Sequence, residues 1–199
     1  RLVRHEANRG IAEAYNTIVR EARGELIAML GDDDVAAPDR IARQVAIFDR
    51  HPDTGVAHGA ATIVDAGGAR RGIWPSRDRS PHELLRHLVR EHNTLVDPTR
   101  MVHRRVYEAV GGYDPACFHA SDLNMWLRIA AVSDVAYVRG APQAIYRIHP
   151  GSMLRSQDAV MGDLHERKAA FDSFFATEPS LADAPEKVFL QKKLLFDLV

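Results

Sequence analysis

The residues with the clearest chemical potential are three consecutive carboxylates, Asp32, Asp33 and Asp34. They follow an apolar run over residues 26–30, which reads as a buried strand that ends at Gly31. Because alternate side chains of an extended chain point the same way, we expect Asp32 and Asp34 to share one face. Two carboxylates at a strand end form a hard-oxygen site for Mg²⁺ or Mn²⁺. The alternative is a solvated acidic turn, which the position after a buried strand disfavours.

Two further side chains could act together with this acidic cluster. Asp122 opens a predicted helix, where the dipole and the free N–H groups hold a carboxylate ionised. The same position also suits an ordinary helix-terminal Asp without a function. His149 follows a predicted strand and could bind a metal through neutral imidazole, although a lone His is more often a surface or packing residue. The acidic cluster is suited to bind a cation, and the separate ionised carboxylate is suited to act as a general base.

The composition is that of a globular domain and excludes several classes of protein. The chain has 199 residues, 46% of them hydrophobic and 27% charged, which is ample for one domain with a real core. Its formal net charge of -1 provides no field to attract nucleic acid, so we expect no nucleic-acid partner. The single cysteine, Cys117, excludes an internal disulfide framework and a multi-cysteine metal site. A reducing cytoplasm fits, because neither a membrane-spanning run nor a signal peptide is visible.

Helical and strand patterns alternate along the chain, which is typical of a doubly wound α/β sheet. Apolar residues at helical spacing predict a first helix that Gly24 closes as a C-cap. A second helix begins at Pro38 and is predicted to bury Ile41, Val45 and Phe48. The predicted elements are helices over residues 11–22, 38–50, 80–90, 106–110 and 123–131, and strands over residues 26–30, 56–64, 71–74, 101–103, 135–138 and 144–148.

The last quarter of the chain has a helical pattern of its own. Its apolar stripe, which includes Phe171, Phe174 and Phe175, must bury against another surface. We therefore expect a core domain over residues 1–152 and a helical extension over residues 153–199. The stripe could cap the sheet, join a second subunit in a homo-oligomer, or contact a membrane-bound partner.

Several short motifs follow one another along the first three quarters of the chain. They are Asn8-Arg9-Gly10, Asn16, Ala22-Arg23-Gly24-Glu25, Leu30-Gly31-Asp32-Asp33-Asp34, Pro38-Asp39-Arg40, Val110-Gly111-Gly112-Tyr113-Asp114, Ser121-Asp122-Leu123-Asn124-Met125-Trp126-Leu127-Arg128 and Tyr146-Arg147-Ile148-His149. Their order and spacing are those of family 2 glycosyltransferases, which the sequence resembles over residues 1–152. The resemblance implies a GT-A-like (Rossmann-like) mixed sheet flanked by helices, a nucleotide-diphosphate sugar donor and usually a divalent cation, Mn²⁺ or Mg²⁺.

Carried over position by position, the resemblance assigns a role to each candidate residue. Asp32 and Asp34 match the motif that holds the metal and the donor diphosphate, and Asp33 would lie beside the ribose or the donor sugar. His149 matches a position that supplies an additional metal or diphosphate contact in some relatives. Asp122 matches the general base.

The remaining assignments concern the two substrates. By the same resemblance Asn8 and Arg9 would approach the donor nucleotide. Gly112, Tyr113 and Trp126 would lie on the side of a saccharide or lipid-linked acceptor.

The sequence departs from the family pattern at three points. The family commonly has Asp where this chain has Gly31, which shifts the register of the acidic motif and affects the role of Asp33. It commonly has Glu where this chain has Ser121, next to the predicted base. It also begins with nucleotide-binding strands before the equivalent of Arg1, so we expect the sequence to hold the metal and acceptor parts of the site.

The reaction that the resemblance implies is sugar transfer with inversion at the anomeric carbon, in the synthesis of bacterial surface polysaccharide or glycoconjugate. A cytoplasmic location near the inner membrane face would fit that role. One alternative is a non-catalytic saccharide- or protein-binding domain derived from a glycosyltransferase, against which the retention of Asp32, Asp34 and Asp122 argues. A nucleotidyltransferase is another, but a Gly-rich basic phosphate loop is not visible in the sequence.

Overall fold

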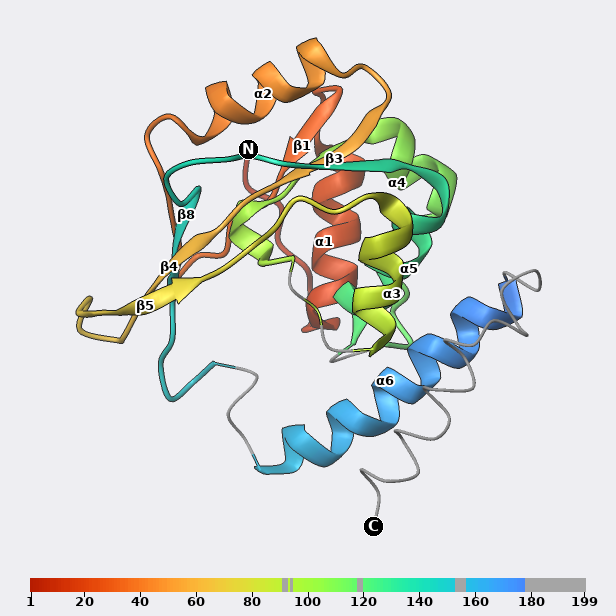
Figure 1. The fold of residues 1–199 in the computed structure, drawn as a ribbon. Helices are drawn as coiled ribbons and strands as arrows, with labels where there is room; N and C mark the ends of the chain where they lie inside the picture. The colour runs from red at the N-terminus through yellow and green to blue at the C-terminus, as the bar shows by residue number, and fades with distance from the viewer. Residues whose placement is uncertain (91–92, 94, 118–119, 153–156, 178–199) are drawn as a thin grey trace.

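A computed structural model describes residues 1–90, 93, 95–117, 120–152 and 157–177 (Figure 1). The helices of this part are α1 (Gly10–Glu21), α2 (Arg40–Arg50), α3 (Pro81–Arg90), α4 (Arg104–Val110), α5 (Ser121–Val132) and α6 (Gln157–Thr177), with a 3-10 turn, η1 (Asp97–Thr99). The strands are β1 (Leu26–Ala28), β2 (Val35–Ala36), β3 (Thr54–His58), β4 (Ala61–Val64), β5 (Arg70–Trp74), β6 (Met101–His103), β7 (Asp134–Tyr137) and β8 (Ala144–Arg147). They form two four-stranded sheets.

The first sheet has the strand order β1-β6-β3-β7 and is covered by helices on both faces. β6 is antiparallel to both β1 and β3, while β7 is parallel to β3. Because side chains alternate along a strand, one face packs on α2 through a small cluster of buried residues, Phe48, Ala57, Met101 and Val138. The other face packs on α1, α3, α4 and α5 through a larger cluster that includes Ile27, Val56, Val102 and Val135.

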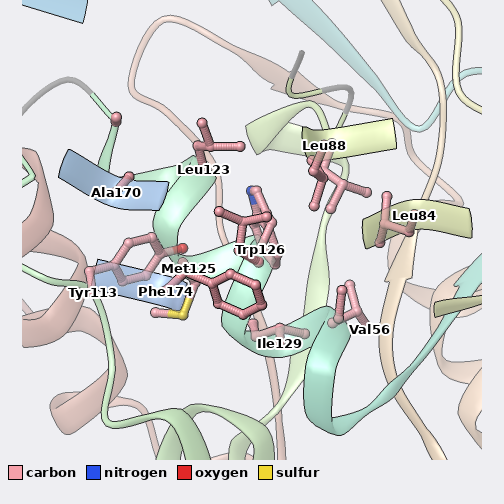
Figure 2. Packing of buried hydrophobic residues seen from close by; sticks show 14 of the residues in the cluster. Val56, Leu84, Leu88, Tyr113, Leu123, Met125, Trp126, Ile129, Ala170 and Phe174 are labelled. Atoms are coloured by element: carbon pink, nitrogen blue, oxygen red, sulfur yellow. The ribbon is translucent and has the colours of Figure 1, made fainter. Parts of the chain in front are cut away.

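Trp126 of α5 lies in the middle of this larger core (Figure 2). Its side chain is fully buried among residues such as Leu84 and Leu88 of α3 and Phe174 of α6. The predicted burial of the C-terminal apolar stripe is confirmed for Phe171, Phe174 and Phe175, because α6 packs against α5. The predicted boundary between a core domain and a helical extension stays a prediction.

The second sheet, with the order β2-β8-β4-β5, carries the segments that follow the acidic loop. The single strand predicted over residues 56–64 is wrong, because the chain passes from the first sheet to the second between β3 and β4. Gly59 lies at this crossing, where an added Cβ atom would meet Cγ of Gln143 at 2.4 Å. The predicted hairpin is confirmed, with β5 antiparallel to β4. β2, which the sequence patterns did not indicate, joins the end of the acidic loop to β8.

Two predicted helix features also differ from the structure. The first helix ends at Ala22, whose N–H donates to the carbonyl of Ile18, and not at Gly24. The second helix buries Arg40, Gln44 and Phe48, whereas Ile41 is half exposed. The guanidinium of Arg40 donates to the carbonyl oxygens of Met29 (3.0 Å) and Arg100 (2.7 Å), so a polar side chain occupies a core position with its hydrogen bonds made.

Gly55 in β3 is required by close packing, and its substitution tests the fold. A Cβ atom there would lie 1.7 Å from Oγ of Ser133 and 2.6 Å from Cγ2 of Val106. We expect Gly55→Ala to lower the free energy of unfolding by about 2 kcal/mol through overpacking, measured by urea denaturation. Gly72→Ala is the matched control, because nothing lies within 4 Å of a Cβ atom there. Equal stabilities of the two variants would contradict the packing of β3.

Candidate active site

The acidic segment after β1 forms a turn and does not continue as an extended chain. The N–H of Asp34 faces the carbonyl of Gly31 at 3.4 Å. A Cβ atom on Gly31 would lie 3.0 Å from a carboxylate oxygen of Asp33 and 3.0 Å from one of Asp34, so both carboxylates lie over this glycine. Asp32 is exposed. The extended chain from which Asp32 and Asp34 were expected to share one face is therefore replaced by a turn, in which Asp33 and Asp34 lie together; the metal role of Asp32 stays a prediction.

Asp34 is held against the second sheet. Its Oδ1 accepts a hydrogen bond from the backbone N–H of Arg147 on β8 (3.0 Å), and the side chain of Arg147 donates to the carbonyl of Asp33 (3.0 Å). Burial raises the pKa of the Asp34 carboxyl to about 6, and the charges of Asp33 and Asp97 add to this effect against the N–H of Arg147. Negative charge at Asp34 is thus poorly compensated by the described residues.

His149 contacts Asp33, and neither Asp32 nor Asp34 is its partner. Its Nε2 lies 3.1 Å from Oδ2 of Asp33, and its Nδ1 accepts from the N–H of Gly151 (3.1 Å). The latter contact assigns the hydrogen of the neutral ring to Nε2, which then donates to Asp33. Within the described residues, no three His, Cys, Asp or Glu side chains are grouped to hold a metal ion. The structure therefore does not bring the predicted set Asp32, Asp34 and His149 together.

Asp97 is a site residue that the sequence patterns did not reveal. It opens η1, which packs against β2 and β8. Its carboxylate accepts from the hydroxyl of Tyr15 on α1 (2.8 Å) and forms an ion pair with Arg100, whose side chain is fully buried. After burial, the negative charge of Asp97 is among the causes that raise the pKa values of Asp34 and Asp122. The sequence signal that could have found Asp97 was its place in a predicted loop, just before the strand predicted over residues 101–103.

Asp122 lies in the first turn of α5 and is partly buried. One carboxylate oxygen accepts from the N–H of Leu123 (2.6 Å) and the other from the side-chain amide of Asn93 (2.5 Å). Burial, followed by the charge of Asp97, raises the pKa of Asp122 to about 6, although Arg100 and the two N–H donors oppose the shift. At neutral pH this carboxylate is ionised, with a pKa close enough to neutrality for a proton acceptor.

Tyr146 on β8 lies within the field of the acidic residues. Its phenol pKa is raised by burial and then by the charges of four carboxylates, namely Asp34, Asp97, Asp33 and Asp122. Contacts place the acidic loop and η1 directly against β8. The sequence predicted two of these segments, and the structure adds η1.

The other predicted site residues lie elsewhere or have structural contacts. Asn8 and Arg9 are exposed just before α1, where Asn8 accepts from the N–H of Gly10 (2.9 Å), and their contact with the donor stays a prediction. Tyr113 and Trp126 are 2% and 0% exposed, so we assign them to the core and no longer to acceptor binding.

Gly112 also has a structural role. It has a φ of 81°, which favours glycine, and an added Cβ atom would lie 2.6 Å from Oδ1 of Asn16. Asn16 exchanges two 2.8 Å hydrogen bonds with the backbone of Tyr113, and Arg128 donates to the carbonyl of Gly112 at 2.7 Å. These motif residues therefore join α1 to α5, and the contact of Gly112 with the acceptor stays a prediction.

A groove of about 1270 Å³ lies apart from these carboxylates. It is lined by parts of α2, β7 and the segment that leads into α3, including Arg43, Arg50 and Arg139. None of the four carboxylates around Tyr146 lines it, so the chemistry of the chain is not centred there. No described helix combines the length and the apolar character needed to cross a bilayer.

Comparisons with known proteins give a consistent identification. Residues 1–111 match the model of "Glycosyl transferase family 2". The chain is 26% identical to the uncharacterized glycosyltransferase MJ1057 of Methanocaldococcus jannaschii over 129 residues, which cover 65% of the chain and 44% of that protein. It is 25% identical to the amylovoran biosynthesis glycosyltransferase AmsE of Erwinia amylovora over 149 residues, which cover 74% of the chain and 53% of that protein.

Among solved structures, TarS of S. aureus in complex with UDP is similar to the chain. The TM-score is 0.57 at 12% identity, and the match covers 86% of this chain and 54% of that one. The chain thus spans about half the length of each of these three proteins. The two mixed sheets with flanking helices have the GT-A type of fold, and the family match extends over more than half of the sequence. From its sequence and its fold alike, the chain belongs to glycosyl transferase family 2.

Proposed function

We propose that this chain holds the metal and acceptor parts of an inverting glycosyltransferase site. The full protein would transfer a sugar from a nucleotide-diphosphate donor to an acceptor hydroxyl. The observation that carries this proposal is the carboxylate of Asp122, which Leu123 and Asn93 hold by hydrogen bonds, in a chain whose acidic turn brings the carboxylates of Asp33 and Asp34 together over Gly31. The name of AmsE supports a role in building a polysaccharide, and we include a cytoplasmic location beside the membrane in the proposal.

Asp122 acts as the general base in this reaction. The acceptor oxygen forms a bond to the anomeric carbon while the bond from that carbon to the diphosphate oxygen breaks. The proton of the acceptor hydroxyl passes to the Asp122 carboxylate. Hydrogen bonds from Leu123 and Asn93 hold this carboxylate in place before the substrate arrives.

The residues of the acidic turn fit a divalent cation by their chemistry. Carboxylate oxygen with imidazole nitrogen is a donor set that suits Mn²⁺, and oxygen alone suits Mg²⁺. Asp33 and Asp34 would supply oxygen donors, and His149 would supply an imidazole nitrogen once its hydrogen bond to Asp33 is exchanged for the cation. When bound, the cation would stabilise the charge of the departing nucleotide diphosphate.

The assignment of Asp33 as a ligand can be tested apart from catalysis. We expect Asp33→Asn to weaken Mn²⁺-dependent binding of the donor nucleotide at least about tenfold, the loss typical of a disturbed metal site. Asp32→Asn is the matched control, because this neighbouring carboxylate is exposed. Isothermal calorimetry with UDP and GDP, with and without Mn²⁺, measures the effect. Equal weakening in both variants, or in neither, would contradict the assignment.

The proposed activity itself requires the full-length protein and a set of nucleotide sugars. We expect release of the nucleoside diphosphate from at least one donor, dependent on Mn²⁺ or Mg²⁺ and faster when a saccharide acceptor is added. Variant Asp122→Asn should bind that donor without turnover. Turnover that is independent of Asp122 would remove the basis of the proposal.

A further inference from the structure

Trp74 on β5 and Tyr146 on β8 form an aromatic pair on one face of the second sheet. Their ring centroids lie 5.7 Å apart with the planes at 90°, and both side chains are partly exposed. On the same face, Ala61 lies opposite both Trp74 and Ala144, and Ile63 lies opposite both Gly72 and Tyr146. Nothing lies within 4 Å of a Cβ atom added to Gly72. The face between the two rings therefore carries small residues beside Trp74 and the apolar side chain of Ile63 beside Tyr146.

This aromatic pair lies directly beside the acidic site. β2 pairs with β8 at Val35 and Ile145, so the preceding Asp34 lies next to Tyr146. The hydrogen bond from the N–H of Arg147 to Asp34 holds the two strands together at that point. The turn η1, which begins with Asp97, packs against both β2 and β8. An apolar aromatic surface and a set of hydrogen-bond acceptors thus meet at one residue.

A pyranose ring has the chemistry that matches such a surface. Its two faces present C–H groups, which are removed from water when they pack on an aromatic ring. Its rim carries hydroxyl groups, which donate strong hydrogen bonds to carboxylates. The surface therefore favours an uncharged sugar.

We propose that Trp74 and Tyr146 form a subsite for a pyranose ring of the acceptor, on which the ring stacks with its hydroxyls toward the acidic turn at Asp34. The subsite rests on the proposed function and specifies it further, because it makes the acceptor a glycoside. Trp74 would be a binding residue that acts on the affinity for the acceptor and not on the affinity for the donor.

Three variants separate this subsite from a structural role of Trp74. Trp74→Ala removes the stacking ring, and Trp74→Phe keeps an aromatic ring at the same place. Ile73→Ala is the matched control, because Ile73 is the preceding residue of β5, points to the opposite face of the sheet and is half exposed. Thermal unfolding of all three variants reports whether the sheet is kept.

Saturation-transfer NMR on the full-length protein measures binding without turnover. The probes are methyl β-D-glucopyranoside, methyl β-D-galactopyranoside and methyl α-D-mannopyranoside, with the open-chain polyol sorbitol as the comparison. We expect transfer to the ring C–H protons of at least one glycoside, and an affinity at least about tenfold lower in Trp74→Ala, the effect of losing about 1.4 kcal/mol. Trp74→Phe and Ile73→Ala should stay close to the wild type. Absence of glycoside binding, or equal binding of sorbitol, would overturn the subsite.

The subsite and the proposed function fail in different ways. If no nucleotide donor is turned over, the proposed function fails, while glycoside binding that depends on Trp74 still supports the subsite. If transfer occurs, Trp74→Ala should raise the KM for the acceptor at least about tenfold, with the KM for the donor unchanged. An unchanged acceptor KM, or a change in the donor KM alone, would overturn the subsite.

Discussion

Replacing Asp122 with asparagine is expected to lower kcat by about 100-fold to 10,000-fold, the usual contribution of a general base. The amide keeps the size of the side chain and can still accept from the N–H of Leu123, but it cannot take a proton from the acceptor hydroxyl. The affinity for the donor should stay close to that of the wild type, because Asp122 lies on the acceptor side of the proposed site. Steady-state kinetics and calorimetry with the donor measure the two effects.

A matched control for this variant is Asp134→Asn. Asp134 is an exposed carboxylate at the start of β7, just beyond the other end of α5. Its substitution should leave both kcat and donor affinity unchanged. If Asp122→Asn retained turnover near that of this control, Asp122 would not be the base, and another of the carboxylates around Tyr146 would have to take its place.

Replacing Asp97 with asparagine should be the most destabilising change of charge in the site. Arg100 is fully buried, and Asp97 is the carboxylate that pairs with it. Without this charge the guanidinium lies over the ring of Trp126, 4.3 Å from its centroid, as an uncompensated buried cation. Breaking a buried pair in this way costs about 3 kcal/mol or more, so we expect the free energy of unfolding in urea to fall by that amount.

The comparison for Asp97→Asn is a surface pair of the same residue types. Arg139 and Asp78 lie 2.8 Å apart with side chains that are 80% and 55% exposed. Removing the Asp78 charge should change stability by less than about 1 kcal/mol, as exposed pairs contribute little. If the two Asp→Asn variants were equally stable, the buried pair between Asp97 and Arg100 would not support the site as described.

The parts of the structure that could be predicted from the sequence are those encoded in short segments. The helix predicted over residues 80–90 begins with a capping box, with the Ser80 N–H donating to Glu83 at 2.8 Å and the Glu83 N–H facing the Ser80 hydroxyl at 3.3 Å. The short helix predicted over residues 106–110 ends at Gly111, which has a φ of 78°. In both cases the residues that begin or end the helix lie within four positions of that helix end in the sequence.

The features that could not be predicted depend on contacts between distant segments. Asp34 bonds to Arg147 across 113 positions, and His149 reaches Asp33 across 116. An extended chain was assumed after β1, so the sequence did not reveal that Asp33 and Asp34 lie together over Gly31. The assignment of Trp126 to the acceptor came from resemblance, which carries no information on burial. Asp97 became a candidate only when the structure placed η1 beside β8.

The pH dependence of kcat/KM for the acceptor tests the central claim most directly. A base whose pKa is raised to about 6 must be deprotonated to act, so the activity of the wild type should be constant above that pH and fall about tenfold per unit below it. Saturating Mn²⁺ keeps the proposed ligand Asp34 ionised, and under this condition the residual activity of Asp122→Asn should lack the acidic limb. An acidic limb of the same position and slope in both proteins would show that another group takes the proton, and would contradict the site as we describe it.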